Sequence, residues 1–191
     1  MADLEVVVAG GGNAALCAAI TAREKGAAVT LFESAPENMR GGNTRHTRNL
    51  RASHAEPLET LEDSYTEDEF WDDILKVTHG NTDETLTRLM IRQSPLLLSW
   101  LKARDVHFQP ALSGTLSLHR TNAFFLGGGK TLLNKLYSHA EKIGVSVIYD
   151  SEVTSVSISN NRAHSIDVTT ATDTKTYGIK HLIAASGGFQ A

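Results

Sequence analysis

The stretch LEVVVAGGGNAALCAAITAREKGAAVTLFE, residues 4–33, decides the fold of this 191-residue chain. Residues 4–9 form an apolar run rich in valine, which is typical of a buried parallel strand. Three glycines follow, and residues 13–25 are dense in alanine and predict a helix that Gly26 terminates. Residues 28–32 predict a second strand. We therefore expect a strand–helix–strand unit with a right-handed crossover.

A G-x-G-x-x-A pattern, formed by Gly10, Gly12 and Ala15, lies between the first strand and the helix. The first glycine permits a tight turn, the second lets the backbone approach a pyrophosphate, and Ala15 keeps helix and strand close together. The helix N-terminus favours an anion there. Glu33 ends the second strand, where its carboxylate can accept hydrogen bonds from ribose hydroxyls. This order predicts dinucleotide binding rather than a glycine-rich turn in another α/β fold.

After Glu33 the chain leaves the simple alternation of strands and helices. Residues 39–54 show no clear period and predict a loop, which is followed by a helical excursion over about residues 56–105. Within it, residues 68–77 predict one helix, and Asp83 can cap a second. Pro95 falls inside the second helical pattern, where we expect it to kink or restart the helix.

The last third of the chain returns to strands. A helix is predicted at residues 130–143 and a third parallel strand at 145–149. Three alternating runs predict an antiparallel β-meander over about residues 152–178, and 181–185 is a further apolar run. These runs are 152–159, 163–170 and 175–178. A meander inserted into a Rossmann-like parallel sheet resembles the glutathione-reductase type of FAD domain. We therefore predict an α/β fold of that type, with FAD favoured over NAD(P).

Composition excludes several classes of protein. Lys and Arg number 18 against 22 Asp and Glu, so the net charge of −4 argues against a general nucleic-acid binder. The single cysteine, Cys17, excludes an internal disulfide framework, and the histidines show no metal-ligand spacing. No run of 18 apolar residues could span a membrane, and the N-terminus lacks the basic residues of a signal peptide. We expect a soluble cytoplasmic protein without a metal site.

Three further motifs resemble the fumarate reductase/succinate dehydrogenase flavoprotein family. They are the GGNT loop at residues 41–44, the glycine turn NAFFLGGGK at 122–130, and AASGGF at 184–189, which is similar to the family's ATGGF segment. More narrowly, residues 42–49, 106–110 and 121–130 are similar to the FAD-dependent tricarballylate dehydrogenases, a branch that includes a flavoprotein of cobalamin synthesis. The resemblance covers almost the whole chain.

This resemblance implies a set of FAD contacts. Gly10, Gly11, Gly12, Asn13 and Ala14 would cradle the pyrophosphate; Glu33, with Ser34 beside it, would bind the adenosine ribose; Gly42, Asn43 and Thr44 would follow the ribityl chain and flavin ring; Val153 would meet the adenine through its backbone; and Ala184, Ser186 and Gly187 would close over the adenosine side. Two of these have simpler alternatives, since Ser186 could be a turn residue and Val153 a plain strand residue.

A basic cluster follows the GGNT loop. Arginine binds carboxylates through two parallel hydrogen bonds, so Arg45, His46 and Arg48 are candidates for binding a di- or tricarboxylate substrate. The alternatives are a solvated basic loop or contacts to the FAD phosphates. Succinate dehydrogenases bind FAD covalently through a nearby histidine, but His46 lies beyond Thr44 and we do not expect it to form such a bond.

The resemblance implies dehydrogenation of a carboxylate such as tricarballylate by hydride transfer to flavin N5, with an electron-transfer partner. The alternatives are a precorrin-oxidising enzyme of cobalamin synthesis and a non-catalytic dinucleotide-binding module. In the family, a capping domain that follows the ATGGF segment supplies the acid/base residues. We therefore expect residues 1–191 to be the N-terminal FAD-binding domain, without the capping domain and without a catalytic residue. Such a chain could be a deliberately shortened protein, a truncated gene product or one part of a split enzyme.

Overall fold

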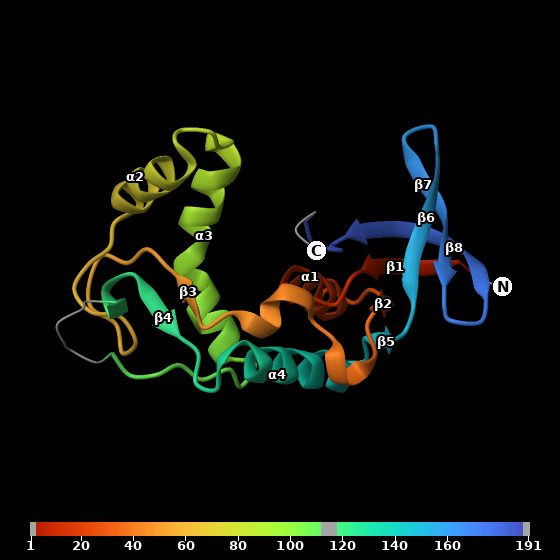
Figure 1. Cartoon of the computed structure of the whole chain (residues 1–191), viewed down its shortest axis with the longest axis horizontal. Helices are drawn as coiled ribbons and strands as arrows, with labels where there is room; N and C mark the ends of the chain where they lie inside the picture. Colours follow the sequence, from red (N-terminus) through yellow and green to blue (C-terminus); the bar gives the residue numbers. More distant parts are fainter. Residues whose placement is uncertain (1–2, 112–117, 189–191) are drawn as a thin grey trace. The chain divides into compact units, whose positions relative to one another are not determined.

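The computed structural model of the chain describes residues 3–111 and 118–188 and divides into two compact units (Figure 1). The first unit contains the chain up to Arg45 and again from Leu133 onward. The second contains His46–Leu132. Each unit has its own strands and its own hydrophobic core.

The first unit is built on one six-stranded sheet in the order β5-β2-β1-β8-β7-β6. Three neighbouring pairs are parallel: β5 with β2, β2 with β1, and β1 with β8. The other two pairs, β8 with β7 and β7 with β6, are antiparallel. The strands are β1 (Leu4–Ala9), β2 (Val29–Phe32), β5 (Ser146–Ile148), β6 (Glu152–Ser159), β7 (Arg162–Thr169) and β8 (Thr174–Ala184). The predicted α/β fold, with a parallel sheet and an antiparallel meander, is confirmed.

The course of β8 differs from the prediction, which had separate runs at 175–178 and 181–185. They form one strand with two partners. Its first half pairs antiparallel with β7, ending at Gly178 opposite Ser165. From Ile179, opposite Leu4, its second half pairs parallel with β1, as Figure 1 shows. The meander is therefore continuous with the parallel sheet.

Helices α1 (Asn13–Glu24) and α4 (Gly128–Lys142) agree with the predicted helices to within two residues at each end. The inner face of α1 is fully buried at Ala15, Leu16, Ala19 and Ile20. Since Ala15 carries only a methyl group, the helix can pack closely on the strands. The sheet also has a core cluster of its own, formed by residues of four strands: Val7, Phe32, Ile166, Val168 and Ile179.

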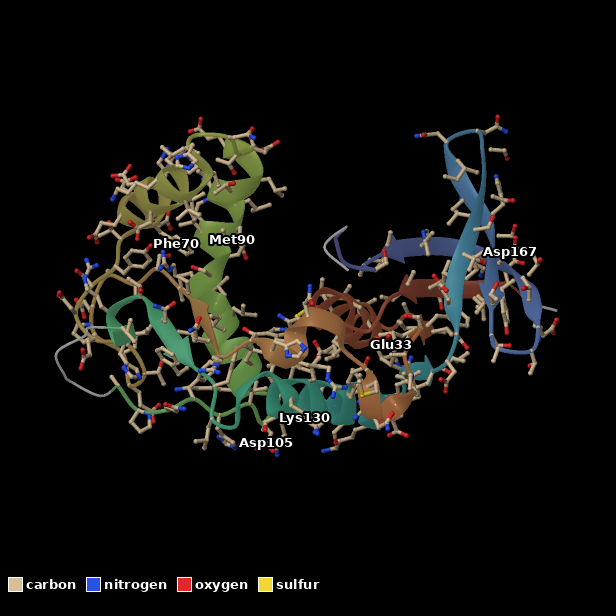
Figure 2. All side chains as sticks on the ribbon, in the orientation of Figure 1. Glu33, Phe70, Met90, Asp105, Lys130 and Asp167 are labelled. Carbon is tan, nitrogen blue, oxygen red and sulfur yellow. The ribbon has the colours of Figure 1, made fainter. Side chains whose placement is uncertain are left out.

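The second unit contains α2 (Glu67–Thr78), α3 (Glu84–Lys102) and the two-stranded sheet of β3 (Asn49–Arg51) and β4 (Asn122–Phe124). Thr66 and Glu69 form a capping box at α2, and Asp83 caps α3 as predicted, with its Oδ1 accepting from Leu86 N at 2.8 Å. Phe70, labelled in Figure 2, is buried with Tyr65 and Ile91.

One prediction for the connecting segments is wrong. Residues 39–54 are not simply a loop, because they contain the 3₁₀ turn Gly42–His46 and the strand β3, which pairs with β4. A shorter 3₁₀ turn, Glu37–Met39, precedes them, and another, Leu118–Arg120, leads into β4. Of the two outcomes expected at Pro95, a restart is excluded, since α3 continues through this residue, whereas a kink stays a prediction. Proline lacks the N–H that would bond the Ile91 carbonyl; that carbonyl instead accepts from Ser94 Oγ at 2.7 Å and Ser53 Oγ at 3.2 Å.

Candidate functional site

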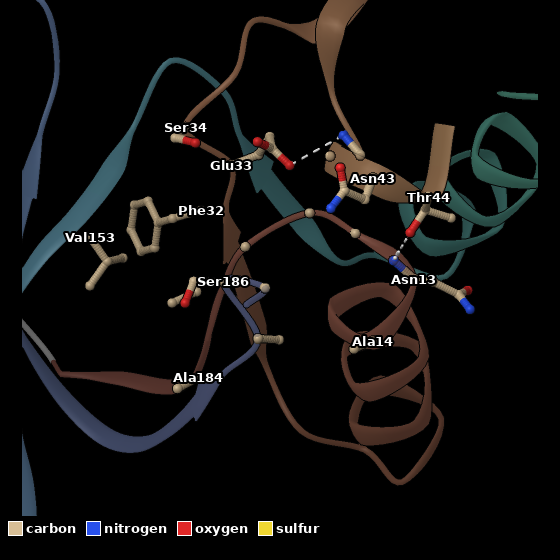
Figure 3. A pocket seen from close by; sticks show the side chains of 18 of the residues that line it. Asn13, Ala14, Phe32, Glu33, Ser34, Asn43, Thr44, Val153, Ala184 and Ser186 are labelled. Carbon is tan, nitrogen blue, oxygen red and sulfur yellow. Dashed lines mark hydrogen bonds between the residues drawn. The ribbon is translucent and has the colours of Figure 1, made fainter. Parts of the chain in front are cut away.

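A pocket of about 660 Å³ lies in the first unit, at the carboxyl ends of the parallel strands (Figure 3). Five segments far apart in the sequence line it: residues 9–14, 32–34, 41–44, 151–153 and 184–188. Each follows or ends a strand of the sheet or joins the strand β2 to the second unit. Ligands of open α/β sheets bind at this edge.

The glycine-rich turn forms one wall of the pocket, and glycine is needed at its positions for different physical reasons. Gly10 has φ +114°, and a Cβ there would collide with the carbonyl of Ala185 on the neighbouring strand end. Gly10 is therefore required by the fold. A Cβ at Gly12 would meet only Thr44 Oγ1 at 3.6 Å and the Gly41 carbonyl at 3.7 Å, which are ordinary contacts. The fold tolerates a side chain at Gly12, so its absence leaves space on the pocket side.

The first turn of α1 faces the pocket without a side-chain cap, because Gly12 is the N-cap residue. One of its N–H groups, that of Asn13, donates to Thr44 Oγ1 at 3.1 Å, drawn as a dashed line in Figure 3. The GGNT loop is thus hydrogen-bonded to the start of the helix. A helix N-terminus whose N-cap residue has no side chain, and which has open space before it, suits a phosphate-containing ligand.

Glu33 lines the pocket at the end of β2, with 6% of its surface exposed. Its carboxylate accepts from Ala35 N at 2.9 Å and from Gly41 N at 3.4 Å. Its backbone is held as well, since Glu33 N donates to the Ile148 carbonyl at 2.9 Å and Ser151 N donates to the Glu33 carbonyl at 3.0 Å. The carboxylate is thus fixed at the pocket wall, where carboxylate oxygens can accept hydrogen bonds from hydroxyl groups.

A family profile described as "FAD binding domain" matches residues 5–191. The chain belongs to this FAD binding domain family. FAD is therefore its cofactor, and the alternative of NAD(P) is set aside. The pocket fits FAD, because the open side of Gly12, the helix N-terminus and the fixed carboxylate of Glu33 suit a pyrophosphate and a ribose.

A curated relative, NADH:fumarate oxidoreductase of Klebsiella pneumoniae (strain 342), is 29% identical over 203 aligned positions, which cover 98% of this chain and 20% of that protein. The broad resemblance to fumarate reductase/succinate dehydrogenase flavoproteins is confirmed, whereas the tricarballylate branch remains a prediction.

Solved structures share the fold. A 3-ketosteroid-Δ4-(5α)-dehydrogenase from Rhodococcus jostii RHA1 superposes with a TM-score of 0.81 at 20% identity, over 99% of this chain and 47% of that one. The open conformation of a flavocytochrome c3 fumarate reductase gives a TM-score of 0.81 at 23% identity, over 97% and 34%. The chain thus spans a fifth of its curated relative and less than half of these two structures.

Every FAD contact predicted from the sequence lines this pocket, although the contact of each with FAD stays a prediction. These residues are Gly10, Gly11, Gly12, Asn13, Ala14, Glu33, Ser34, Gly42, Asn43, Thr44, Val153, Ala184, Ser186 and Gly187. Sequence reasoning did not assign Phe32 or Ser151, which line it next to assigned neighbours. Phe189, the last residue of the AASGGF motif, lies outside the described residues.

Unlike the predicted FAD contacts, the predicted substrate-binding residues Arg45, His46 and Arg48 are not among the described residues that line the pocket. Arg45 is not among the described lining residues, because its guanidinium turns back to the carbonyls of Asn38 and Arg40 at 2.9 and 3.4 Å. His46 and Arg48 belong to the second unit. Their role in binding a carboxylate stays a prediction.

Within residues 3–111 and 118–188, no group of three or more His, Cys, Asp or Glu side chains could hold a metal ion. Among the helices of this described part, none combines the length and apolar character needed to cross a membrane.

Proposed function

We propose that residues 1–191 act as the FAD-binding domain of a flavoprotein oxidoreductase. The observation that carries this proposal is the convergence of the glycine turn, Glu33 and the GGNT loop on one pocket of a chain in the FAD binding domain family. The named activities of its relatives, a fumarate oxidoreductase and a ketosteroid dehydrogenase, support the oxidoreductase class. When bound, FAD supplies a two-electron acceptor or donor.

In this proposal the chain's own residues bind and orient the cofactor. The N–H groups at the start of α1 hold the pyrophosphate, and the Glu33 carboxylate accepts from the ribose hydroxyls. Asn43 and Thr44 line the wall that continues from the glycine turn. The groups that move protons are proposed to lie outside residues 1–191, in a capping domain. A cytoplasmic location and a separate electron-transfer partner belong to the same proposal.

The absorption spectrum of the purified chain tests the cofactor assignment, since bound flavin absorbs visible light. Titration with FAD and with NAD⁺, followed by calorimetry, then compares the two dinucleotides. We expect FAD to bind more tightly. Tighter binding of NAD⁺ would reject the proposal, and FAD binding without any turnover in the complete protein would favour the non-catalytic module.

For the substrate we propose a di- or tricarboxylate such as tricarballylate, with the polycarboxylate tetrapyrrole precorrin as the alternative. The support is the basic cluster after the GGNT loop, Arg45, His46 and Arg48. Arg48→Ala should weaken binding of tricarballylate to the FAD-loaded chain by about 1.5–3 kcal/mol, the range for hydrogen bonds between charged groups. Arg92→Ala, on α3 of the same unit, is the control. Unchanged affinity in Arg48→Ala, and in the combined alanine variants of the cluster, would assign the cluster to solvent or to phosphate. Equal losses in Arg48→Ala and Arg92→Ala would mean a general effect and would reject Arg48 as a substrate contact.

A further inference from the structure

Tyr137 is a fully buried residue of α4 that contacts the glycine-rich turn. Its hydroxyl donates a 2.8 Å hydrogen bond to the carbonyl of Gly11. The two residues are 126 positions apart and both belong to the first unit. Tyr137 does not line the pocket itself, so none of the contacts described above uses it.

Gly11 lies between this hydroxyl and the carboxylate of Glu33. A Cβ built on Gly11 would collide with both Glu33 Oε2 and the Tyr137 hydroxyl oxygen. The G-x-G pattern allows any residue at the middle position. In this chain only glycine fits there, because three groups meet at this point: the turn, the carboxylate and the phenol.

The phenol is held in place and kept protonated. The Arg40 guanidinium lies over its ring, 4.1 Å from the centroid, and donates to Tyr149 Oη at 2.5 Å and Glu37 Oε1 at 3.3 Å. Burial, and then the negative charge of Glu33, raise the pKa of the Tyr137 hydroxyl. It therefore stays a donor throughout the neutral range.

We propose that Tyr137 is a positioning residue for the adenosine half of FAD, because it ties the turn that faces the pyrophosphate to the carboxylate that faces the ribose. The inference rests on the proposed FAD-binding function. Loss of the hydroxyl would leave the Gly11 carbonyl without its buried donor, and the turn and Glu33 would no longer share a fixed contact. The flavin end of the cofactor would be unaffected.

The test compares the affinities of three ligands, FAD, ADP and riboflavin, for the wild-type chain and two variants by calorimetry. In Tyr137→Phe, we expect the affinities for FAD and ADP to fall about 5- to 20-fold, while the affinity for riboflavin, which lacks both the adenosine and the phosphates, changes less than twofold. Tyr177→Phe is the matched control, since it removes a phenol hydroxyl from the same unit near Phe32 and should change none of the affinities. Equal losses for FAD and riboflavin would mean general loosening and would overturn the proposal, as would unchanged ADP affinity.

ADP separates this inference from the proposed function. If the wild-type chain binds ADP and Tyr137→Phe weakens it, the inference stands even when no redox turnover is found. If the wild-type chain binds FAD but not ADP, the inference fails and the proposed function stands; if it binds neither, both fail. A double-mutant cycle adds a second readout: Gly11→Ala should lower thermal stability less in the Tyr137→Phe background, where one colliding oxygen is gone. Additive losses would show that the two residues do not meet and would overturn the inference.

Discussion

At the scale of single residues, two glycines of one short turn have different roles: Gly10 is needed for the fold, and Gly12 for ligand binding. Gly10 combines a positive φ with close packing on Ala185, so any side chain there distorts the backbone. Gly12 has φ −77°, which every residue adopts, and its missing Cβ borders the pocket. The same residue type is thus needed for different reasons two positions apart, and substitutions can measure each reason separately.

Gly12→Val should fold normally but lose at least about tenfold in FAD affinity, since its side chain fills the space where a pyrophosphate approaches the helix N-terminus. Gly10→Ala should instead lower the thermal midpoint of unfolding even without FAD. Calorimetric titration and thermal unfolding of both variants check this. A Gly12→Val chain with wild-type FAD affinity would remove the turn from the cofactor site.

At the scale of elements, α3 tolerates a central proline because side chains replace the lost backbone hydrogen bond. Ser94 Oγ donates to the Ile91 carbonyl and accepts from Ser53 N at 3.0 Å, and all of these groups are buried. The Pro95 position thus depends on two serines, one of them outside the helix. The sequence shows the proline within a helical pattern, but it does not predict that serine side chains replace the lost backbone hydrogen bond.

Ser94→Ala should destabilise the second unit by about 1–3 kcal/mol, because Ser53 N then loses its buried acceptor. Ser99→Ala is the matched control on the same helix, as Ser99 Oγ donates to the Leu96 carbonyl on the exposed side. Its effect should be within about 0.5 kcal/mol. Urea unfolding followed by the fluorescence of Trp71 and Trp100, both in the second unit, measures the difference. Equal effects would refute the role of Ser94.

Tyr65, in the segment before α2, gives the second unit a dependence on alkaline pH. Burial, and next its hydrogen bond to Asp73 at 2.9 Å, raise the pKa of Tyr65 to about 12. Between pH 10 and pH 12 the unfolded chain loses this proton and the folded chain keeps it, so stability falls as pH rises through that window. Tyr65→Phe should flatten the fall measured by tryptophan fluorescence, whereas Tyr177→Phe should not. A slope unchanged by Tyr65→Phe would contradict this assignment.

At the scale of the whole molecule, local sequence patterns predicted most of the helices and strands. Features that depend on pairing between distant segments could not be predicted in this way. The strand–helix–strand unit at residues 4–33 and the cap at Asp83 depend on neighbours in sequence, and both were predicted. The pairing of β3 with β4 joins three-residue strands from distant segments, which carry too little periodicity to be recognised. The burial of Glu33 and its contact with Gly41 likewise depend on how segments meet, although the carboxylate itself was predicted.

The described lining of the pocket offers few groups that could transfer a proton, and this gives the last prediction. Among its described lining residues, the titratable side chains are Glu33 and Glu152, and Glu33 is engaged by the N–H groups of Ala35 and Gly41. Dehydrogenation of a carbon chain needs a base positioned at the reacting carbon. The 191-residue chain with added FAD should therefore oxidise neither tricarballylate nor succinate, nor reduce fumarate, above the rate of free FAD. A dye acceptor or donor assay measures this. Turnover above that rate would contradict the prediction and direct alanine substitutions to Arg45, His46, His119 and Arg120 as sources of the catalytic group.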